Sequence, residues 1–359
     1  MNIAVIDVAA ENGGALSVLK DFLEYVVSVN DENKYYVFVS KEIDIIHPRI
    51  QYILKSEVKN SWLSRLKWEH FSAIKELKAL NIDVVFSLQN TAFFTRKLRQ
   101  VVYFHNALLL EPRRKYSLFK KSERRYGIYT RFIGPYTFKS LKNATTIICQ
   151  TETVKSAVEK RVSSAQVYAV NPNVFVDEPL INSANDTIRG YLYPAAAVPF
   201  KKIEDVIRCY KNHHSWFDQN GLELLITIDG TENDYAKSLA NLSKNISGIR
   251  LIGYQQRRTI LEKYKDYALI INSELESYPI PFIEAGLVGT SIVAADYPYA
   301  IEILKNNQNA AIYKKNDLSD MFEKMKYVYQ NERTEHVVNE QKNTWAIVKT
   351  ILTDETIEE

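Results

Sequence analysis

The chain has 359 residues, of which 46% are hydrophobic and 25% charged, and its formal net charge is +3. This composition is that of an ordinary globular protein and excludes an intrinsically disordered chain. The length exceeds what one hydrophobic core usually covers, so we expect two domains. No apolar run approaches the roughly 18 residues that span a bilayer, and the first residues lack the basic start and cleavage site of a signal peptide. We therefore expect a cytoplasmic protein.

The chain has two cysteines, Cys149 and Cys209. Their spacing fits neither a zinc site nor a disulfide framework, so we expect two buried thiols in a reducing compartment. No metal site is predicted from these residues.

The first half of the chain alternates short apolar runs with amphipathic stretches. Residues 2–8 indicate a buried strand, which is followed by a turn containing Gly13 and Gly14 and by a helix with one apolar face. Further buried strands are indicated at 35–40, 83–88, 101–105 and 144–150. Strands of this kind, separated by helices, predict a doubly wound parallel sheet in an α/β domain.

Two features of this half stand where ligands bind in such sheets. His105 follows the strand at 101–105, and ligands bind beyond the carboxyl ends of parallel strands. Gly13 and Gly14 would let the backbone approach a phosphate or sugar closely. Each has a plainer interpretation, because a histidine at a strand end can simply bond a neighbouring loop and a tight turn can use glycine for geometry alone.

Residues 113–142 concentrate the positive charge of the chain. The segment has ten Lys or Arg, one acid and seven Tyr or Phe, so it carries +9 and leaves the rest at about −6. Basic residues interleaved with aromatic rings are typical of a surface that binds an anionic membrane or a lipid-pyrophosphate acceptor. A merely solvated basic face and a nucleic-acid site are the alternatives. We do not expect nucleic acid as a partner, since the charge is confined to one part of the chain.

The second half repeats the α/β pattern. A last strand of the first domain is indicated at 167–175 and a polar linker at 177–189, before a strand that leads to a loop with Lys201 and Lys202. Further strands are indicated at 222–230, 249–256 and 266–274, and a closing helix in the tail 340–359.

Residues 276–304 hold the most specific motif. Glu276 and Glu284 are separated by seven residues, with Pro281 suited to the first position of a helix and Gly289 to its C-cap. Glu284 would then lie in the first helical turn. The N-terminus of such a helix can bind a phosphate or another anion, and Glu276 would reach the same crevice from the preceding strand end.

This stretch resembles the donor site of the retaining GT-B glycosyltransferases of family 4, in a branch that assembles bacterial polysaccharides. The resemblance rests on the two glutamates, on the run that continues through Pro298, Tyr299 and Ala300, and on Tyr193-Pro194-Ala195 with Pro199-Phe200-Lys201 upstream. It implies two Rossmann-like domains that face a cleft: an acceptor domain at 1–176, a linker at 177–189, a nucleotide-sugar domain at 190–335, and a helix at 336–359 that crosses back to the first domain.

The resemblance also implies roles for individual residues. Lys201 would bind the diphosphate, Glu284 the ribose, Glu276 a hydroxyl of the donor sugar, Tyr254 the base, and His105 would face the transferred sugar. Lys202 or an arginine from elsewhere would supply a second charge, and Gly13 and Gly14 would border the cleft. The remaining predicted nucleotide-sugar contacts come from the turn between the glutamates: Ser277, Tyr278, Ile280 and Pro281.

The implied activity is transfer of a sugar, with retention of configuration and without a metal, from a UDP- or GDP-sugar. The acceptor would be a saccharide or an undecaprenyl-pyrophosphate-linked oligosaccharide at the inner face of the cytoplasmic membrane, in cell-surface polysaccharide biosynthesis. Two departures favour an alternative: no arginine stands just upstream of Lys201, and Pro279 replaces the usual glycine. The alternative is a non-catalytic GT-B accessory protein that binds a saccharide or a partner glycosyltransferase.

Overall fold

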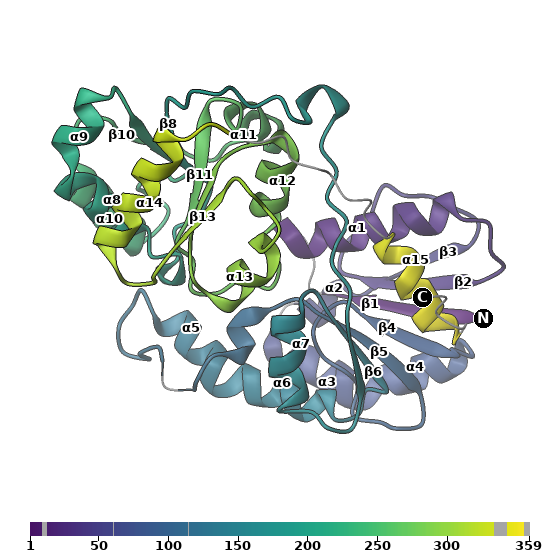
Figure 1. The fold of residues 1–359 in the computed structure, drawn as a ribbon. Coiled ribbons are helices and arrows are strands. Elements are labelled where there is room, and N and C mark those ends of the chain that lie inside the picture. Colours follow the sequence, from purple (N-terminus) through teal and green to yellow (C-terminus); the bar gives the residue numbers. More distant parts are fainter. Residues whose placement is uncertain (9–12, 60, 114, 334–342, 355–359) are drawn as a thin grey trace. The chain divides into compact units, whose positions relative to one another are not determined.

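The structure is a computed structural model that describes the chain except residues 9–12, 60, 114, 334–342 and 355–359. The chain divides into two compact units. The first comprises Met1–Tyr116, Tyr126–Pro172 and Lys342–Glu359, and the second Ser117–Arg125 and Asn173–Gln341. Each unit is an α/β structure around one parallel sheet (Figure 1).

The first unit has a seven-stranded sheet in the order β3-β2-β1-β4-β5-β6-β7, and every neighbouring pair is parallel. Its strands are β1 (Asn2–Asp7), β2 (Lys34–Val39), β3 (Ile50–Leu54), β4 (Val84–Ser87), β5 (Arg99–Phe104), β6 (Thr146–Cys149) and β7 (Gln166–Ala169). Its helices are α1 (Gly13–Ser28), α2 (Ser56–Lys59), α3 (Trp62–Lys67), η1 (Trp68–Ser72), α4 (Ala73–Ala79), η2 (Ala107–Leu110), η3 (Tyr129–Ile133), α6 (Gly134–Leu141), α7 (Glu152–Glu159) and α15 (Thr344–Thr353). Helix α5 (Arg124–Ile128) begins in the second unit and ends in the first.

The second unit has a six-stranded parallel sheet in the order β10-β9-β8-β11-β12-β13. Its strands are β8 (Gly190–Tyr193), β9 (Glu223–Ile226), β10 (Ile249–Leu251), β11 (Tyr267–Ile271), β12 (Ile292–Ala295) and β13 (Ala310–Tyr313). Its helices are η4 (Glu178–Leu180), η5 (Pro199–Lys201), α8 (Ile203–Asn212), α9 (His214–Gln219), α10 (Asp234–Ser243), α11 (Arg257–Lys263), α12 (Ile280–Val288), α13 (Pro298–Leu304) and α14 (Leu318–Gln330).

These sheets confirm the predicted α/β class with two Rossmann-like parallel-sheet domains. In both, the central strands are fully buried, as expected when helices cover the two faces of a parallel sheet. Strand β3, an edge strand whose residues are partly buried or exposed, was not predicted from the sequence. Both cysteines are buried, as predicted, and burial raises the pKa of each thiol to about 12.

Helix α15 belongs to the core of the first unit. Val348 is fully buried in one cluster with Leu19 and Val37, and the ring of Trp345 lies 5.3 Å from that of Phe22. The contact buries an apolar helix face, the usual source of helix stability in a protein. Figure 1 shows this helix, in yellow, beside the strands of the first sheet.

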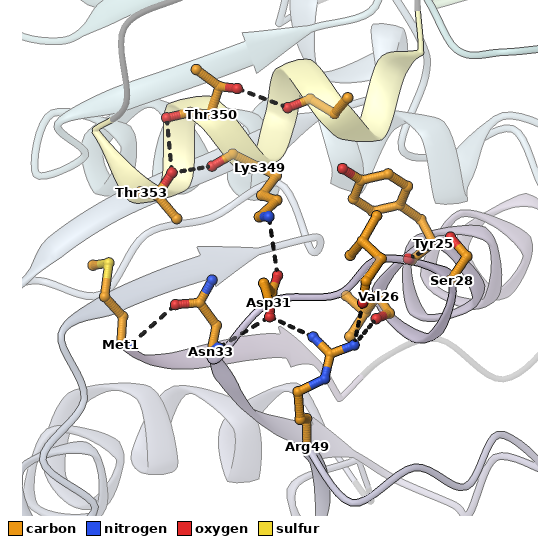
Figure 2. Close-up of polar contacts among 12 residues, drawn as sticks. Met1, Tyr25, Val26, Ser28, Asp31, Asn33, Arg49, Lys349, Thr350 and Thr353 are labelled. Atoms are coloured by element: carbon orange, nitrogen blue, oxygen red, sulfur yellow. Dashed lines mark hydrogen bonds and ion pairs between the residues drawn. The ribbon is translucent and has the colours of Figure 1, made fainter.

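A buried carboxylate ties the same helix to the amino ends of the strands. Asp31, which is 8% exposed, contacts Arg49 and lies 3.3 Å from Lys349 Nζ (Figure 2). The Asn33 N–H also donates to Asp31, and Arg49 donates to the Val26 carbonyl at 2.6 Å. Burial acts to raise the pKa of Asp31, but these hydrogen bonds and charges outweigh it, so the pKa lies below its usual value.

Candidate functional site

The loop that carries the two predicted lysines lies at the carboxyl end of β8. Its backbone is bonded to the end of β11, because Glu274 N–H donates to the Phe200 carbonyl at 2.7 Å and the Asn272 amide donates to the Lys202 carbonyl at 3.1 Å. Lys202 has a φ of 47°, a left-handed conformation that turns the chain into α8. The two strand ends therefore hold the lysines and the glutamates at one edge of the sheet.

Lys201 and Glu276, which are 75 residues apart in the sequence, are in direct contact. Lys201 Nζ donates to Glu276 Oε1, and the two side chains are 18% and 17% exposed. Both side chains are thus mostly buried but keep some exposed surface. A cation and a carboxylate so placed can bind a phosphate oxygen and a hydroxyl of the same ligand.

Lys202 is directed to other partners. Its Nζ lies 2.9 Å from Glu274 and 2.6 Å from the Asn316 amide oxygen. Burial acts to lower the pKa of Lys202, but the hydrogen bond and charge of Glu274 outweigh it and raise the pKa. Lys202 is therefore charged and, like Lys201, paired with a glutamate in this arrangement. Its role as a second diphosphate ligand stays a prediction.

Helix α12 starts one residue earlier than expected. Its N-cap is Pro279, so Pro281 is the second helical residue and Glu284 the fifth, and the prediction that Glu284 lies in the first turn is wrong. Pro279 fits the N-cap because that position needs no N–H of its own. The predicted C-cap is correct, since Gly289 has a φ of 84°.

The N-terminus of α12 offers few backbone donors to an anion. Ile280 N–H donates to the Tyr278 carbonyl at 3.0 Å, Phe282 N–H donates to the Pro279 carbonyl at 2.9 Å, and Pro281 has no N–H. Side chains, and not backbone N–H groups, would therefore provide most of the contacts to a bound anion. Of the two predicted diphosphate contacts, Lys201 and the start of α12, we therefore expect Lys201 to contribute more.

Glu284 is 5% exposed and points to an arginine that the sequence analysis did not single out. Arg257 Nε donates to Glu284 Oε1 at 2.6 Å, while the other end of the guanidinium bonds the Phe175 carbonyl. Burial raises the pKa of Glu284, and Arg257 only partly offsets the effect. Arg257 begins α11, which follows β10 and the turn at Gly253. Its place just after a strand end was the sequence signal that could have identified it.

The other predicted contacts of this site differ in exposure. Tyr254 is 87% exposed after Gly253, whose φ is 67°, so its ring is open to stacking by a base. Ile280 is 44% exposed, whereas Tyr278 is largely buried, and burial raises its pKa to about 12. Ser277 and Pro281 lie in the same turn and helix start.

Three of the predicted residues, Gly13, Gly14 and His105, belong to the first unit. Gly13 and Gly14 are the first residues of α1 and not part of a preceding turn, which lies outside the described residues. His105 follows β5, and its backbone N–H donates to the Asn90 side-chain oxygen at 2.8 Å. That bond orients the Asn90 amide so that its nitrogen donates to His105 Nε2 at 3.3 Å.

The electrostatics of His105 follow from this contact. Burial lowers its pKa to about 4, so the ring is neutral near pH 7. Because Nε2 accepts a hydrogen bond, the proton of the neutral ring is on Nδ1. Nδ1 is buried and has no partner among the described residues. His105 can therefore donate a hydrogen bond to a ligand but does not carry a charge.

Metal ligands do not gather at either site. No group of three or more His, Cys, Asp or Glu side chains within the described part of the chain is arranged to hold a metal ion. Metal independence stays a prediction.

Residues 181–345 match the family model for glycosyl transferases group 1. This region includes Lys201, Arg257, Glu276 and Glu284. The chain is also 26% identical over 187 residues to the O-antigen chain mannosyltransferase RfbU of Salmonella typhimurium. That alignment covers 50% of this chain and 49% of the relative, so the chain spans about half the length of the curated relative it matches.

Solved structures resemble the chain over nearly its whole length. Sucrose-phosphate synthase of Thermosynechococcus elongatus matches 98% of this chain and 94% of its own, with a TM-score of 0.67 and 14% identity. Anabaena HepE, solved with UDP-glucose, matches 92% and 90% (TM-score 0.63, 14% identity). WaaG, a glycosyltransferase of lipopolysaccharide biosynthesis, matches 92% and 91% (TM-score 0.62, 12% identity). At these identities the similarity shows the fold, which is that of GT-B proteins.

Proposed function

We propose that the protein is a glycosyltransferase that moves a sugar from a nucleoside-diphosphate sugar to a saccharide or lipid-linked oligosaccharide, with retention of configuration. The observation that carries the proposal is the contact between Lys201 and Glu276. It lies at the carboxyl edge of a parallel sheet, within the region that matches glycosyl transferases group 1. Glu284 and Arg257 form a second pair in the same region.

These side chains fit the electrostatic needs of the reaction. Cleavage of the donor builds negative charge on the leaving diphosphate, and a fixed cation stabilises that charge without a metal. Lys201 supplies the cation, and Glu276 accepts a hydrogen bond from a hydroxyl of the donor sugar. Glu284 accepts hydrogen bonds from the ribose and is held by Arg257. Arg257 is also a source of the second positive charge, since its side chain is 57% exposed.

The donor is a UDP- or GDP-sugar in this proposal. UDP is supported by the ligand in the HepE structure, and mannose by the name of RfbU. Pro279 leaves the choice of donor sugar open, because it removes one backbone N–H that could meet a sugar hydroxyl at this turn. The names of RfbU and WaaG support a place in cell-surface polysaccharide biosynthesis.

A thermal-shift panel of UDP, GDP, dTDP, ADP and CMP, with and without a divalent metal, tests the donor site. A nucleotide at about a hundred times its dissociation constant should add roughly 2.7 kcal/mol of stability. We expect one nucleotide to do so without metal, to lose the effect in Lys201→Ala, and to keep it in Lys211→Ala, a variant of an exposed lysine on α8. If no nucleotide stabilises the wild type, the accessory-protein alternative is favoured.

Retention is tested separately, because no contact in the site specifies the stereochemistry. The anomeric configuration of the first-formed product is read from the proton coupling constants in NMR spectra of the reaction. We expect the configuration of the donor sugar in the product. The opposite configuration would contradict the retaining mechanism but not the assignment of the donor site.

A peripheral position on an anionic membrane is a further part of the proposal. No helix within the described residues is long and apolar enough to cross a bilayer. In the second unit, Phe119 is 92% exposed and stands among the exposed Lys120, Lys121, Arg124 and Arg125. An exposed ring among cations suits the headgroup region.

Vesicle sedimentation tests this surface. Each neutralised cation should weaken binding by about 1 kcal/mol, so Lys121→Gln with Arg124→Gln and Arg125→Gln should largely release the protein from anionic vesicles. Arg131 is less suitable, because it donates to the Arg113 and Tyr116 carbonyls within the first unit. Unchanged binding of the triple variant would contradict the membrane role.

A basic cavity in the first unit supports a lipid-pyrophosphate acceptor. It has a volume of about 350 Å³, and its lining includes four cations, one carboxylate and one ring: Arg113, Lys139, Lys142, Arg161, Glu111 and Phe138. The double variant Lys139→Met with Lys142→Met should raise KM for a pyrophosphate-linked acceptor and leave KM for the free saccharide unchanged. An equal effect on both acceptors would contradict this assignment.

A further inference from the structure

The loop that carries Lys201 and Lys202 is held in place through its carbonyl groups. It comprises residues 194–202, between the end of β8 and the start of α8, and its carbonyls accept hydrogen bonds from groups outside the loop. The acceptors and their donors are Ala195 with Thr227, Ala197 with Asn233, Phe200 with the Glu274 N–H, Lys201 with Tyr193, and Lys202 with Asn272. The strand ends around the loop therefore fix its backbone.

Tyr193 makes the contact to Lys201. It ends β8 and is fully buried, and its hydroxyl donates to the Lys201 carbonyl. The same hydroxyl accepts a hydrogen bond from the Asn272 N–H at 3.2 Å. Burial raises the pKa of Tyr193 well above its usual value, so the hydroxyl keeps its proton and remains a donor. Tyr193 thus joins the end of β11 to the peptide group of Lys201.

Asn272 makes the corresponding contact to Lys202. It follows β11 and is 2% exposed, and its Nδ2 donates to the Lys202 carbonyl at 3.1 Å. Its Oδ1 accepts from the Tyr313 hydroxyl at 2.7 Å, and this bond decides which end of the amide faces the loop. Lys202 has a left-handed φ of 47°, which residues other than glycine adopt only where their surroundings hold them. The bond from Asn272 is one such restraint.

Tyr313 reaches Asn272 across a strand that has a small side chain at this point. In the register of the sheet Tyr313 lies beside Ala295 of β12. Ile271 lies beside Ala294, so the register continued by one residue places Asn272 on the other side of Ala295. A larger side chain there would stand between the tyrosine and the amide. Burial also raises the pKa of Tyr313 well above its usual value, so its hydroxyl stays a donor.

We infer that Tyr193, Asn272 and Tyr313, here called the loop network, are positioning residues for the two lysines. All three are at most 2% exposed, so they do not reach a ligand, and their hydrogen bonds hold the lysine backbone. If the proposed glycosyltransferase function holds, the loop network keeps the Lys201 ammonium group where the leaving diphosphate develops its charge. A cation fixed in advance stabilises such charge without reorganisation. Its placement matters more here because no arginine stands just upstream of Lys201.

The test compares two tyrosines of one strand. Tyr193→Phe removes a hydroxyl of the loop network. Tyr191→Phe removes another fully buried hydroxyl of β8, which donates to the Met325 carbonyl of α14 at 2.7 Å. Both variants leave buried polar groups unpaired, so both should lower the thermal midpoint of the ligand-free protein. Only Tyr193→Phe should also disturb Lys201. Tyr313→Phe is a second variant of the loop network, and it acts on Lys202 through Asn272.

NMR spectra of the reductively ¹³C-methylated full chain report on the lysines directly, because methylation keeps their charge. The resonances of Lys201 and Lys202 are identified by their loss in Lys201→Ala and Lys202→Ala. In the ligand-free protein the Lys201 resonance should shift or broaden in Tyr193→Phe, and the Lys202 resonance in Tyr313→Phe. Both should stay at their wild-type positions in Tyr191→Phe. Unchanged lysine resonances in Tyr193→Phe and Tyr313→Phe would overturn the inference, because the hydroxyls would then serve stability alone.

A double-mutant cycle connects the loop network to the donor site. Isothermal titration calorimetry measures the dissociation constants of UDP and GDP for the wild type, Tyr193→Phe, Lys201→Ala and the double variant. Tyr193→Phe should weaken the nucleotide that binds about three- to tenfold, the effect of one neutral hydrogen bond. In the Lys201→Ala background it should have no further effect, since a residue that acts through Lys201 then has nothing to position. Additive losses would contradict the positioning role, and Tyr191→Phe should leave the affinity unchanged in both backgrounds.

The two measurements separate failure of the inference from failure of the proposed function. If neither nucleotide binds the wild type and the Lys201 resonance still responds to Tyr193→Phe but not to Tyr191→Phe, the positioning role is supported and the proposed donor site fails. If a nucleotide binds and Tyr193→Phe behaves as Tyr191→Phe in both measurements, the donor site is supported and the positioning role is overturned.

Discussion

The two carboxyl edges of the parallel sheets use polar residues in different ways. In the second unit the strand ends carry ion pairs, Lys201 with Glu276 and Arg257 with Glu284, and part of each pair is exposed. In the first unit Asp7 ends β1, but Gln89 and His105, which follow β4 and β5, are neutral, and each has one buried polar atom without a hydrogen-bond partner among the described residues. The paired charges suit a ligand that is itself charged, and the neutral groups suit hydroxyls. One sheet architecture thus presents two different binding chemistries.

A further contrast lies within the first unit. At the carboxyl edge, Gln89 Oε1 and His105 Nδ1 have no hydrogen-bond partner among the described residues, whereas the network of Asp31 at the amino edge leaves its carboxylate well satisfied. Asp31 joins Arg49 and Lys349 and so attaches α15 to the strands (Figure 2). The amino edge stabilises the fold, and the carboxyl edge remains available for a ligand. The predictions below test this division.

The largest effect is expected at Glu276. Glu276→Ala should reduce kcat about 10²- to 10³-fold, because it removes a fixed polar group at the site where charge develops. The variant should keep the circular dichroism spectrum of the wild type, since the side chain is at the sheet edge and not in the core. Glu262→Gln, which changes another glutamate paired with a lysine, is the control. Normal turnover in Glu276→Ala would place the reaction elsewhere.

The second effect concerns stability and not activity. Asp31→Asn should lower the free energy of unfolding of the first unit by about 3 kcal/mol, the usual cost of breaking a buried ion pair. Its lowered pKa contributes stability above the unfolded value of about 4, and this contribution is lost as the pH falls through the folded pKa. As the pH is lowered, the free energy of unfolding of the variant should therefore fall less steeply than that of the wild type.

Denaturant unfolding at several pH values, followed by tryptophan fluorescence and circular dichroism, measures this difference. Asp44→Asn, at an exposed aspartate of the same unit, is the matched control and should behave as wild type. An acid dependence that is identical in Asp31→Asn and wild type would show that the network does not hold α15 in place.

The sequence predicted much of this arrangement and missed particular parts of it. Periodic apolar runs predicted the buried strands, which the structure confirms, and a motif singled out Glu276, Glu284 and Lys201, whose roles stay predictions; both signals are local. The partners of these residues depend on contacts between distant segments: Arg257 meets Glu284 across 27 residues, and Glu69 meets Tyr136 across 67. No short-range pattern marks such pairs.

The boundaries of α12 show a different limit. Both Pro279 and Pro281 are compatible with a helix start, and the sequence does not say which is used. The structure uses Pro279 as the N-cap, and the shift of one position moves Glu284 out of the first turn. The order of these residues was predictable, and their exact register on the helix was not.

A smaller effect is expected at Glu284, where a substitution should raise the stability of the protein but weaken nucleotide binding. Burial raises its pKa, so the ionised form costs stability that is recovered only as the pH falls through the folded pKa. Glu284→Gln should therefore raise the unfolding midpoint of the ligand-free protein at pH 7. The same change should weaken the nucleotide by roughly 1.5 to 3 kcal/mol, the value of a hydrogen bond to a charged group. Thermal shift with and without nucleotide measures both, and a midpoint below the wild-type value would contradict the assigned cost of burial.

The smallest expected effect is the absence of a titration at His105. Burial lowers its pKa to about 4, so the ring should stay neutral from pH 5.5 to 8, with its proton on Nδ1 because Nε2 accepts from Asn90. The Cε1 proton resonance of His105, identified by its loss in His105→Gln, should not move over this range, whereas an unperturbed histidine titrates near 6.5. A midpoint near 6.5 would mean that the ring becomes charged within this range. If the resonance is instead constant and shifts only when a neutral glycoside is added, His105 acts as a fixed donor to the ligand, and any pH dependence of transfer in this range comes from other groups.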